Sequence, residues 1–166
     1  SLRHLLPGAA EATAARRGGG GGGGARLCNF NTQHKHEPAS FDAWMAVLRA
    51  TPRATLTLKR PGSAAVVADI EAEAAARGGD ARRRIEWADK LPSRDAHLQR
   101  VANECDAFLD SWMYGAHMTG ADALWAAVPL LTIAGYGHGA RPAGFAGAGG
   151  GDGDGGGDLF GRADSR

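Results

Sequence analysis

Hydrophobic residues recur along the chain in two alternating patterns, short apolar runs and amphipathic stretches with helical spacing. The clearest amphipathic stretch is SFDAWMAVLRAT, where apolar residues at positions i, i+3, i+4 and i+7 share one helix face: Phe41, Trp44, Met45 and Leu48. Further helices are expected in SAAVVADIEAEAAARGG, in SRDAHLQRVANEC and over residues 119–127. The expected strands, in chain order, are RLCNFN, ATLTLK, RRIEWAD, AFLDS and PLLTIA.

The alternation of strands and helices, with short connections, predicts the fold class. Parallel strands need crossover connections that usually contain a helix, so this order indicates an α/β fold with a parallel sheet and helices on both faces. In such sheets, ligands bind beyond the carboxyl ends of the strands. His97 starts the third helix, and four other histidines lie in the loops that follow strands: His34, His36, His117 and His138. The sequence therefore predicts a pocket at this edge of the sheet.

Polar residues mark the expected helix starts. Ser40, Ser63 and Ser93 precede three of the helical stretches and are candidate N-caps. Thr119 and Asp122 have capping-box spacing at the start of the last helix, which would satisfy free backbone N–H groups. A second interpretation stays open, because a helix N-terminus preceded by Gly and flanked by His is also a good place for a phosphate.

Composition limits the part of the chain that folds. Gly accounts for 26 of the 166 residues and concentrates in the tracts Gly18–Gly24 and Gly144–Gly161. These tracts are expected to be disordered, since glycine has high backbone entropy and little surface to bury. The foldable part is therefore about Arg26 to Pro142. A formal net charge of +1 gives no indication of binding to nucleic acid or to a membrane.

The two cysteines and the N-terminal residues give an indication of the cellular compartment. Cys28 and Cys105 lie in apolar surroundings without metal-binding spacing, and no disulfide is expected between them. No apolar run reaches the length of a membrane span, and the N-terminal residues lack the pattern of a signal peptide. A soluble intracellular protein is the expectation.

The polar residues at the carboxyl edge of the predicted sheet are the candidates for a binding site. The chain lacks a GxGxxG fingerprint after the first strand and lacks a Walker A loop. The loop histidines have no paired carboxylates to complete a metal site. Lys35, the histidines and the helix N-terminus at Thr119 remain, and these groups suit a diphosphate neutralised without a metal. Taken alone, Lys35 is better explained as a solvated charge on a loop.

Three longer segments carry a resemblance to a known family: LCNFNTQHKHEPASFDAWMAVLRATPRATL, DKLPSRDAHLQRV and FLDSWMYGAHMTGADALWAAVPLLTIAG. In order and spacing they resemble the C-terminal catalytic half of the O-linked N-acetylglucosamine transferase and SPINDLY family, over about Arg26 to Arg141. The resemblance implies the Rossmann-like, nucleotide-binding half of a GT-B glycosyltransferase. It also implies transfer of N-acetylglucosamine from UDP-N-acetylglucosamine to Ser/Thr hydroxyls of cytoplasmic and nuclear proteins, with no metal or other cofactor.

The same resemblance implies roles for residues of this chain. Lys35 corresponds to a lysine that contacts the donor diphosphate, and Asp122 to an aspartate that hydrogen-bonds the ribose. His97 corresponds to a histidine packed on the nucleotide, with Arg100 near the base. The family's His-Thr-Thr stretch, which lines the diphosphate, corresponds to His117, Met118 and Thr119.

The chain departs from the family pattern at three places. Thr32 stands where the family has Gln, and Gln33 follows it, so either is a candidate for that role. Met118 lacks the hydroxyl of a family threonine but keeps the backbone N–H. In the PSRDAH loop, Ser93 and Arg94 are both candidates for the position of a family lysine.

These patterns divide the chain into three regions. Residues 1–25 are expected to be a Gly-rich linker or tail, residues 26–142 the nucleotide-sugar-binding domain, and residues 143–166 a disordered Gly/Asp-rich tail. The family's general base and acceptor groove belong to the other half of the catalytic region, so no catalytic residue is assigned and this chain alone is expected to be inactive. Two alternatives stay open: O-fucosyl transfer of the SPINDLY type, and a non-catalytic nucleotide-binding or interaction module.

Overall fold

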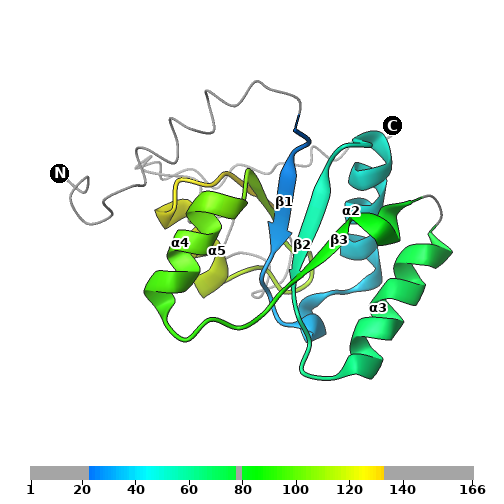
Figure 1. Cartoon of the computed structure of the whole chain (residues 1–166), viewed down its shortest axis with the longest axis horizontal. Helices are drawn as coiled ribbons and strands as arrows, with labels where there is room; N and C mark the ends of the chain where they lie inside the picture. The colour runs from blue at the N-terminus through cyan, green and yellow to red at the C-terminus, as the bar shows by residue number, and fades with distance from the viewer. Residues whose placement is uncertain (1–22, 78–79, 133–166) are drawn as a thin grey trace, which may run out of the picture.

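The computed structural model describes residues 23–77 and 80–132, which contain a five-stranded parallel sheet (Figure 1). The strands lie in the order β3-β2-β1-β4-β5 across the sheet. Their bounds are Arg26–Asn29 (β1), Thr55–Lys59 (β2), Ile85–Ala88 (β3), Ala107–Leu109 (β4) and Leu130–Leu131 (β5). Each expected strand is found within its predicted segment.

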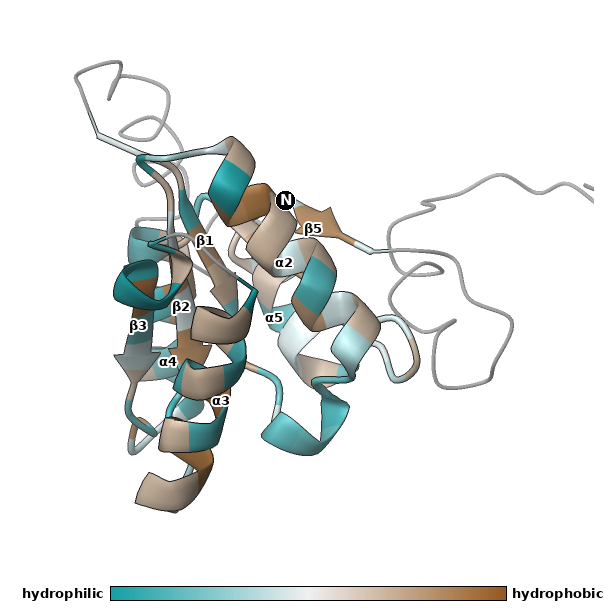
Figure 2. Ribbon diagram, turned by 90° about the vertical axis from the view of Figure 1, so that its right-hand side faces the viewer, coloured by the Kyte–Doolittle hydropathy of each residue, from teal (hydrophilic) through white to brown (hydrophobic). Residues whose placement is uncertain are grey.

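Helices cover both faces of the sheet, which confirms the predicted α/β fold class. Figure 1 shows the sheet between the pair α4 and α5 and the pair α2 and α3. In Figure 2, α2 and α3 carry both teal and brown residues, the mixed pattern of helices that bury one face. The helices are α2 (Pro38–Ala50), α3 (Ala64–Ala76), α4 (Arg94–Glu104) and α5 (Met118–Trp125), with short 3₁₀ helices η2 (Gln33–Lys35) and η3 (Ala81–Arg84).

The core is divided by the sheet into two apolar clusters, because successive strand residues point to opposite faces. Leu27 of β1 belongs to the cluster on the α2 side, together with Trp44 and Leu48 of that helix. Its neighbour Cys28 belongs to the cluster on the other side, with Val101 of α4. β1 is therefore buried on both faces over Leu27, Cys28 and Asn29.

The strand order reverses at β1, and this reversal positions the site. From β1 the chain adds β2 and β3 on one side, and it later adds β4 and β5 on the other. Because the connections after β1 and after β4 lead to helices on opposite faces, a crevice opens between them at the carboxyl ends of the strands. The polar loops NTQHKHEP and SWMYGAHMTG flank this crevice.

One sequence expectation is wrong: Cys28 and Cys105 form a disulfide, with their Cα atoms 5.9 Å apart. Both cysteines are fully buried. The pairing follows from topology, since β1 lies beside β4 and Cys105 stands at the end of α4, directly before β4. Cysteines separated by 77 residues give no such signal in the sequence.

Helix caps differ from their predictions in two of three cases. Ser93 caps α4, accepting a hydrogen bond from the backbone N–H of Ala96 at 3.1 Å. Ser63 stands at the N-cap of α3 but its side chain makes no capping bond. Ser40 is not a cap, because α2 already begins at Pro38 after Glu37. Proline favours the first helical position, where the N–H that it lacks has no helical acceptor.

The predicted N-terminal linker and C-terminal tail lie outside the described residues, apart from Gly23, Gly24 and Ala25 of the linker. The loop GYGHGAR, with His138, lies outside them too.

Candidate functional site

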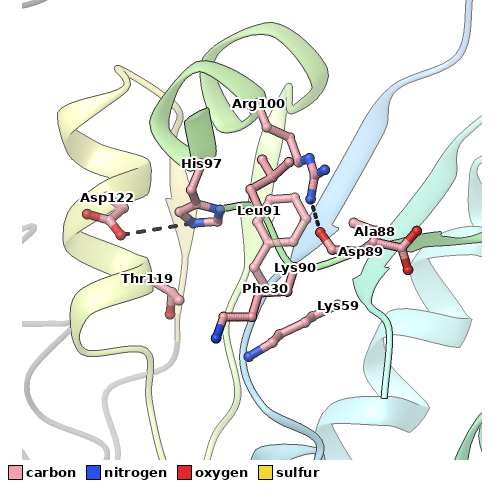
Figure 3. Close-up of a pocket in the computed structure, with 10 residues that line it drawn as sticks. All are labelled: Phe30, Lys59, Ala88, Asp89, Lys90, Leu91, His97, Arg100, Thr119 and Asp122. Atoms are coloured by element: carbon pink, nitrogen blue, oxygen red, sulfur yellow. Dashed lines mark hydrogen bonds and ion pairs between the residues drawn. The ribbon is translucent and has the colours of Figure 1, made fainter. Parts of the chain in front are cut away.

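Two adjoining pockets form a groove along the carboxyl edge of the sheet. The first, here called the His97 pocket, has a volume of about 190 Å³ and is drawn in Figure 3. The second, the Lys35 pocket, has a volume of about 300 Å³. They share Phe30, Lys59 and Thr119, so we treat them together as the edge groove.

Most of the predicted donor-binding residues line this groove. His97, Arg100 and Asp122 line the His97 pocket, and Thr119 lines both pockets. The Lys35 pocket contains four more of them: Thr32, Lys35, His117 and Met118. Gln33 lines neither pocket, because its amide donates instead to the main-chain oxygen of Lys59 at 2.8 Å. Of the two candidates Thr32 and Gln33, it is Thr32 that faces the groove.

The Lys35 ammonium group is held between the loops that follow β1 and β4. Its Nζ donates to the main-chain oxygen of Gly115 at 3.3 Å and lies 4.3 Å from the ring centroid of Tyr114. Burial lowers the pKa of Lys35, against an opposing effect of the Asp110 carboxylate. A positioned cation of this kind, with N–H donors still available, is suited to an anion in the pocket.

Asp110 fixes the loop between β4 and α5. Its buried carboxylate accepts from the backbone N–H groups of Ser111 at 2.8 Å and of Ala116 at 2.6 Å. The same carboxylate accepts from the hydroxyl of Thr132, which follows β5, at 2.9 Å. The loop is therefore anchored to the sheet at both ends before α5 begins.

The start of α5 corrects the predicted capping box. The helix begins at Met118, with His117 as N-cap and no side-chain capping bond, so Thr119 lies inside the first turn. The Thr119 hydroxyl donates to Oδ1 of Asn31, across the groove on the loop after β1. Since neither Thr119 nor Asp122 caps the helix, its first N–H groups lack a capping side chain, and the residues at this helix start, His117, Met118 and Thr119, line the Lys35 pocket.

The helix also ends earlier than predicted, at Trp125 instead of Ala127. Ala127 has a φ of 57°, a left-handed conformation that a right-handed helix does not contain. Such a residue is a common helix stop, although glycine is usual there.

Asp122 forms an ion pair in the His97 pocket. It is 6 % exposed, and its Oδ1 accepts from Arg94 Nη2 at 2.7 Å and from Arg94 Nε at 3.2 Å. Its other oxygen lies 3.9 Å from Nε2 of His97. Between the two candidates in the PSRDAH loop, Arg94 is the one whose side chain reaches a groove residue, since Ser93 caps α4.

His97 and Phe30 form an aromatic wall in the His97 pocket. Their rings meet edge to face, with centroids 5.2 Å apart. Burial lowers the pKa of His97, with Asp122 opposing the shift, so the ring is mainly neutral at pH 7. Arg100 stands at the pocket margin, where its Nη1 donates to the main-chain oxygen of Asp89 at 2.6 Å (Figure 3). Neutral rings beside a guanidinium group suit the binding of a planar base.

The remaining histidines do not gather at one point. His34 lines the Lys35 pocket, whereas His36 packs edge to face on Trp44 with ring centroids 5.1 Å apart. Within residues 23–77 and 80–132, no group of three or more His, Cys, Asp or Glu side chains is placed to hold a metal ion. In the same residues, no helix is long and apolar enough to span a membrane.

Among the groove residues that the sequence did not assign to the donor are Asn31, Lys59, Lys90 and Tyr114. Lys59 ends β2 and Lys90 follows β3, so their positions at strand ends were an available signal. Asn31 is 2 % exposed, and its Nδ2 has no acceptor among the described residues. Its place opposite α5 depends on how β1 and α5 pack, which no local pattern indicates.

A separate apolar pocket of about 330 Å³ lies on the α2 side of the sheet, beside the edge strand β5. Trp44, Val47 and Leu131 are among its lining residues, and no Lys or Arg lines it. None of the predicted donor-binding residues lies there.

Comparison with known proteins identifies the family of this chain. Residues 22–145 match the sequence profile described as "Glycosyl transferase family 41". The chain is 30% identical over 108 residues to a UDP-N-acetylglucosamine--peptide N-acetylglucosaminyltransferase of Caenorhabditis elegans, covering 64% of this chain and 9% of the relative. It is 31% identical over 104 residues to a probable enzyme of the same description from Arabidopsis thaliana, covering 63% of this chain and 10% of the relative.

A solved structure, of a mutant Thermobaculum terrenum O-GlcNAc transferase, is 29% identical with a TM-score of 0.67, covering 73% of this chain and 23% of that one. This chain therefore spans about a tenth of the curated relatives and about a quarter of the solved one. The match to the family profile extends over most of the sequence and includes all of the edge groove. The resemblance read from the sequence is confirmed: the chain belongs to glycosyl transferase family 41.

Proposed function

We propose that this chain is the donor-binding domain of a protein O-glycosyltransferase that transfers N-acetylglucosamine from UDP-N-acetylglucosamine to Ser/Thr hydroxyls. The observation that carries the proposal is the convergence of Lys35, His97 and Thr119 on one groove at the point where the strand order reverses. These residues come from separate parts of the chain, and the family resemblance assigns each of them to the donor. Dinucleotide and nucleotide ligands bind at this point in doubly wound sheets.

In this proposal the nucleoside occupies the His97 pocket. The base stacks near His97 with Arg100 at its edge, and the ribose hydroxyls hydrogen-bond to Asp122. Because Asp122 is already paired with Arg94, its carboxylate is held in place and its second oxygen remains to accept from the ligand. The nucleoside therefore meets a pocket that is formed in advance.

The diphosphate occupies the Lys35 pocket. The Lys35 ammonium group and the first N–H groups of α5 neutralise it, while His117 and Thr119 line its path. The same groups would stabilise the charge that develops on the diphosphate as the sugar leaves, which is the step that a transferase must accelerate. We assign this stabilisation to lysine and backbone dipoles, with no metal ion required.

The acceptor side belongs, in this proposal, to another part of the whole protein. We place the general base and the binding groove for protein acceptors there, and we assign no catalytic residue in this chain. The relatives are protein glycosyltransferases by their printed names, so the proposed partners are proteins with accessible Ser/Thr hydroxyls. The proposed compartments are the cytoplasm and the nucleus.

Calorimetric titration of the chain with UDP, UDP-N-acetylglucosamine and GDP-fucose tests the proposal. We expect both uridine nucleotides to bind at one site, and Lys35→Met to weaken them about tenfold to a hundredfold, the effect of losing a hydrogen bond to a charged group. Arg83→Ala is the matched control, since Arg83 is an exposed cation of η3 at the amino end of β3. Tighter binding of GDP-fucose would identify O-fucosyl transfer instead, and binding of none of the three would refute a donor site.

A further inference from the structure

The lysines of this chain are few, and they share one location. Of the 19 lysines and arginines only three are lysines, Lys35, Lys59 and Lys90. Each follows or ends a different strand at the same edge of the sheet: η2 after β1, the last residue of β2, and the loop after β3. All three line the edge groove, whereas the arginines are spread over the whole chain. This segregation points to a task that a compact ammonium group performs and a planar guanidinium does not.

The acidic groups of the groove are already paired, which leaves two of these lysines without an ion-pair partner among the described residues. Asp122 is paired with Arg94 at 2.7 Å, and Asp89 with Arg60 at 2.7 Å. Over the part of the chain that the structure describes, neither Lys59 nor Lys90 has a carboxylate oxygen within ion-pair distance. Figure 3 shows both side chains directed into the His97 pocket, with their nitrogens on the side that faces Thr119. The groove therefore carries positive charge that no carboxylate of the described residues neutralises.

Lys59 differs from the other two lysines because it lines both pockets. Lys90 lines only the His97 pocket, and Lys35 only the Lys35 pocket. A ligand with its nucleoside in one pocket and its diphosphate in the other must pass Lys59 where the nucleoside joins its first phosphate. The backbone of Lys59 is fixed at this junction by its place in β2 and by the hydrogen bond from Gln33 at 2.8 Å.

We infer that Lys59 binds the phosphate adjacent to the nucleoside, so that the donor diphosphate is held by two lysines, Lys59 at the inner phosphate and Lys35 at the outer one. This inference rests on the proposed function. Lys59 thereby makes the groove select nucleoside diphosphates over unphosphorylated nucleosides, since its ammonium group contributes only when a phosphate is present.

The test compares UDP with uridine by calorimetry on the parent chain and its variants. Lys59→Met should weaken UDP binding about tenfold to a hundredfold and leave uridine binding within about twofold. Arg83→Met is the control and should change the UDP-to-uridine affinity ratio by less than about threefold, because Arg83 is an exposed cation of η3 that lines neither pocket. Lys59→Arg should recover only part of the ratio, because a planar guanidinium restores the positive charge but not the compact ammonium group.

A second measurement avoids variants altogether. Acetylation of the parent chain by acetic anhydride, read by peptide mass spectrometry, reports on three lysines that all lie in the groove. UDP should slow acetylation of Lys59 more than uridine does. Equal protection by the two ligands, or an unchanged UDP-to-uridine ratio in Lys59→Met, would overturn the inference while the parent chain still binds UDP. Failure of the parent chain to prefer UDP to uridine would instead refute the proposed function, and the inference with it.

Discussion

His36 gives a quantitative prediction about stability, because it is a buried histidine directly after Lys35. Burial lowers its pKa to about 4, with Glu37 acting in the opposite direction and His34 in the same direction. Its Nε2 lies 3.3 Å from Oδ1 of Asn29, and its Nδ1 is buried without a partner among the described residues. The folded protein therefore holds the neutral ring.

The direction of the pH effect follows from this lowered pKa. In the unfolded chain His36 titrates at its ordinary pKa of 6.5, so between pH 6.5 and about 4 the unfolded state binds a proton that the folded state does not. Stability from this residue is present above pH 6.5 and is lost as the pH falls toward 4. For these two pKa values the loss between pH 7 and pH 5 is about 2 kcal/mol, a large part of the stability of a small domain.

The assay is urea denaturation at pH 7 and at pH 5, followed by tryptophan fluorescence, on the parent chain and on His36→Gln. Glutamine keeps a donor toward Asn29 but does not titrate. We expect the parent to lose about 2 kcal/mol more than the variant between the two pH values. All other titrating groups, His97 included, are common to both proteins and cancel in the comparison. Equal losses in the two proteins would show that His36 is not held neutral by burial.

Three further predictions concern the disulfide and the groove. Reducing the Cys28–Cys105 disulfide, or replacing Cys105 with Ser, should lower the free energy of unfolding by about 4 kcal/mol, because the bond closes a loop of 77 residues. The intact mass of the parent chain under non-reducing conditions verifies that the bond is formed before the comparison. Asp122→Asn should weaken UDP and uridine by the same factor, about tenfold, because the ribose is common to both, and a loss confined to UDP would contradict the ribose contact. Excess EDTA should leave the calorimetric affinity for UDP unchanged within about twofold, whereas a larger loss would show that a metal neutralises part of the diphosphate.

The fold followed closely from the sequence because its signals are local and repeated. The strands are short segments rich in apolar residues, and the helices have an apolar face. Their alternation along the chain indicates a parallel sheet covered by helices. Once the strands are parallel, the loops after them must lie at one edge of the sheet. The proximity of Lys35 and Thr119 could therefore be predicted from the order of strands and helices. The disulfide could not, since the register that brings Cys28 to Cys105 is set by packing across the sheet.

Site residues were predicted less completely, and the reasons are physical. Thr119 and Asp122 have capping-box spacing, yet both side chains bond elsewhere, to Asn31 and to Arg94. Spacing along a helix cannot reveal such partners, because they come from other loops of the sheet edge. In the sequence Lys59 has the pattern of an ordinary polar residue at the end of a strand. That it makes no ion pair with a described carboxylate is visible only in three dimensions.

Amide chemical shifts measured by NMR during a UDP titration test most directly whether the edge groove binds a nucleoside diphosphate. We expect the largest shift changes in residues 31–35, 94–100 and 117–122, on the loops and helix starts that build the two pockets. We also expect uridine to shift the amides of 94–100 more than those of 31–35. Shift changes confined to the apolar pocket around Trp44, Val47 and Leu131, or no changes at saturating UDP, would show that the edge groove is not the binding site.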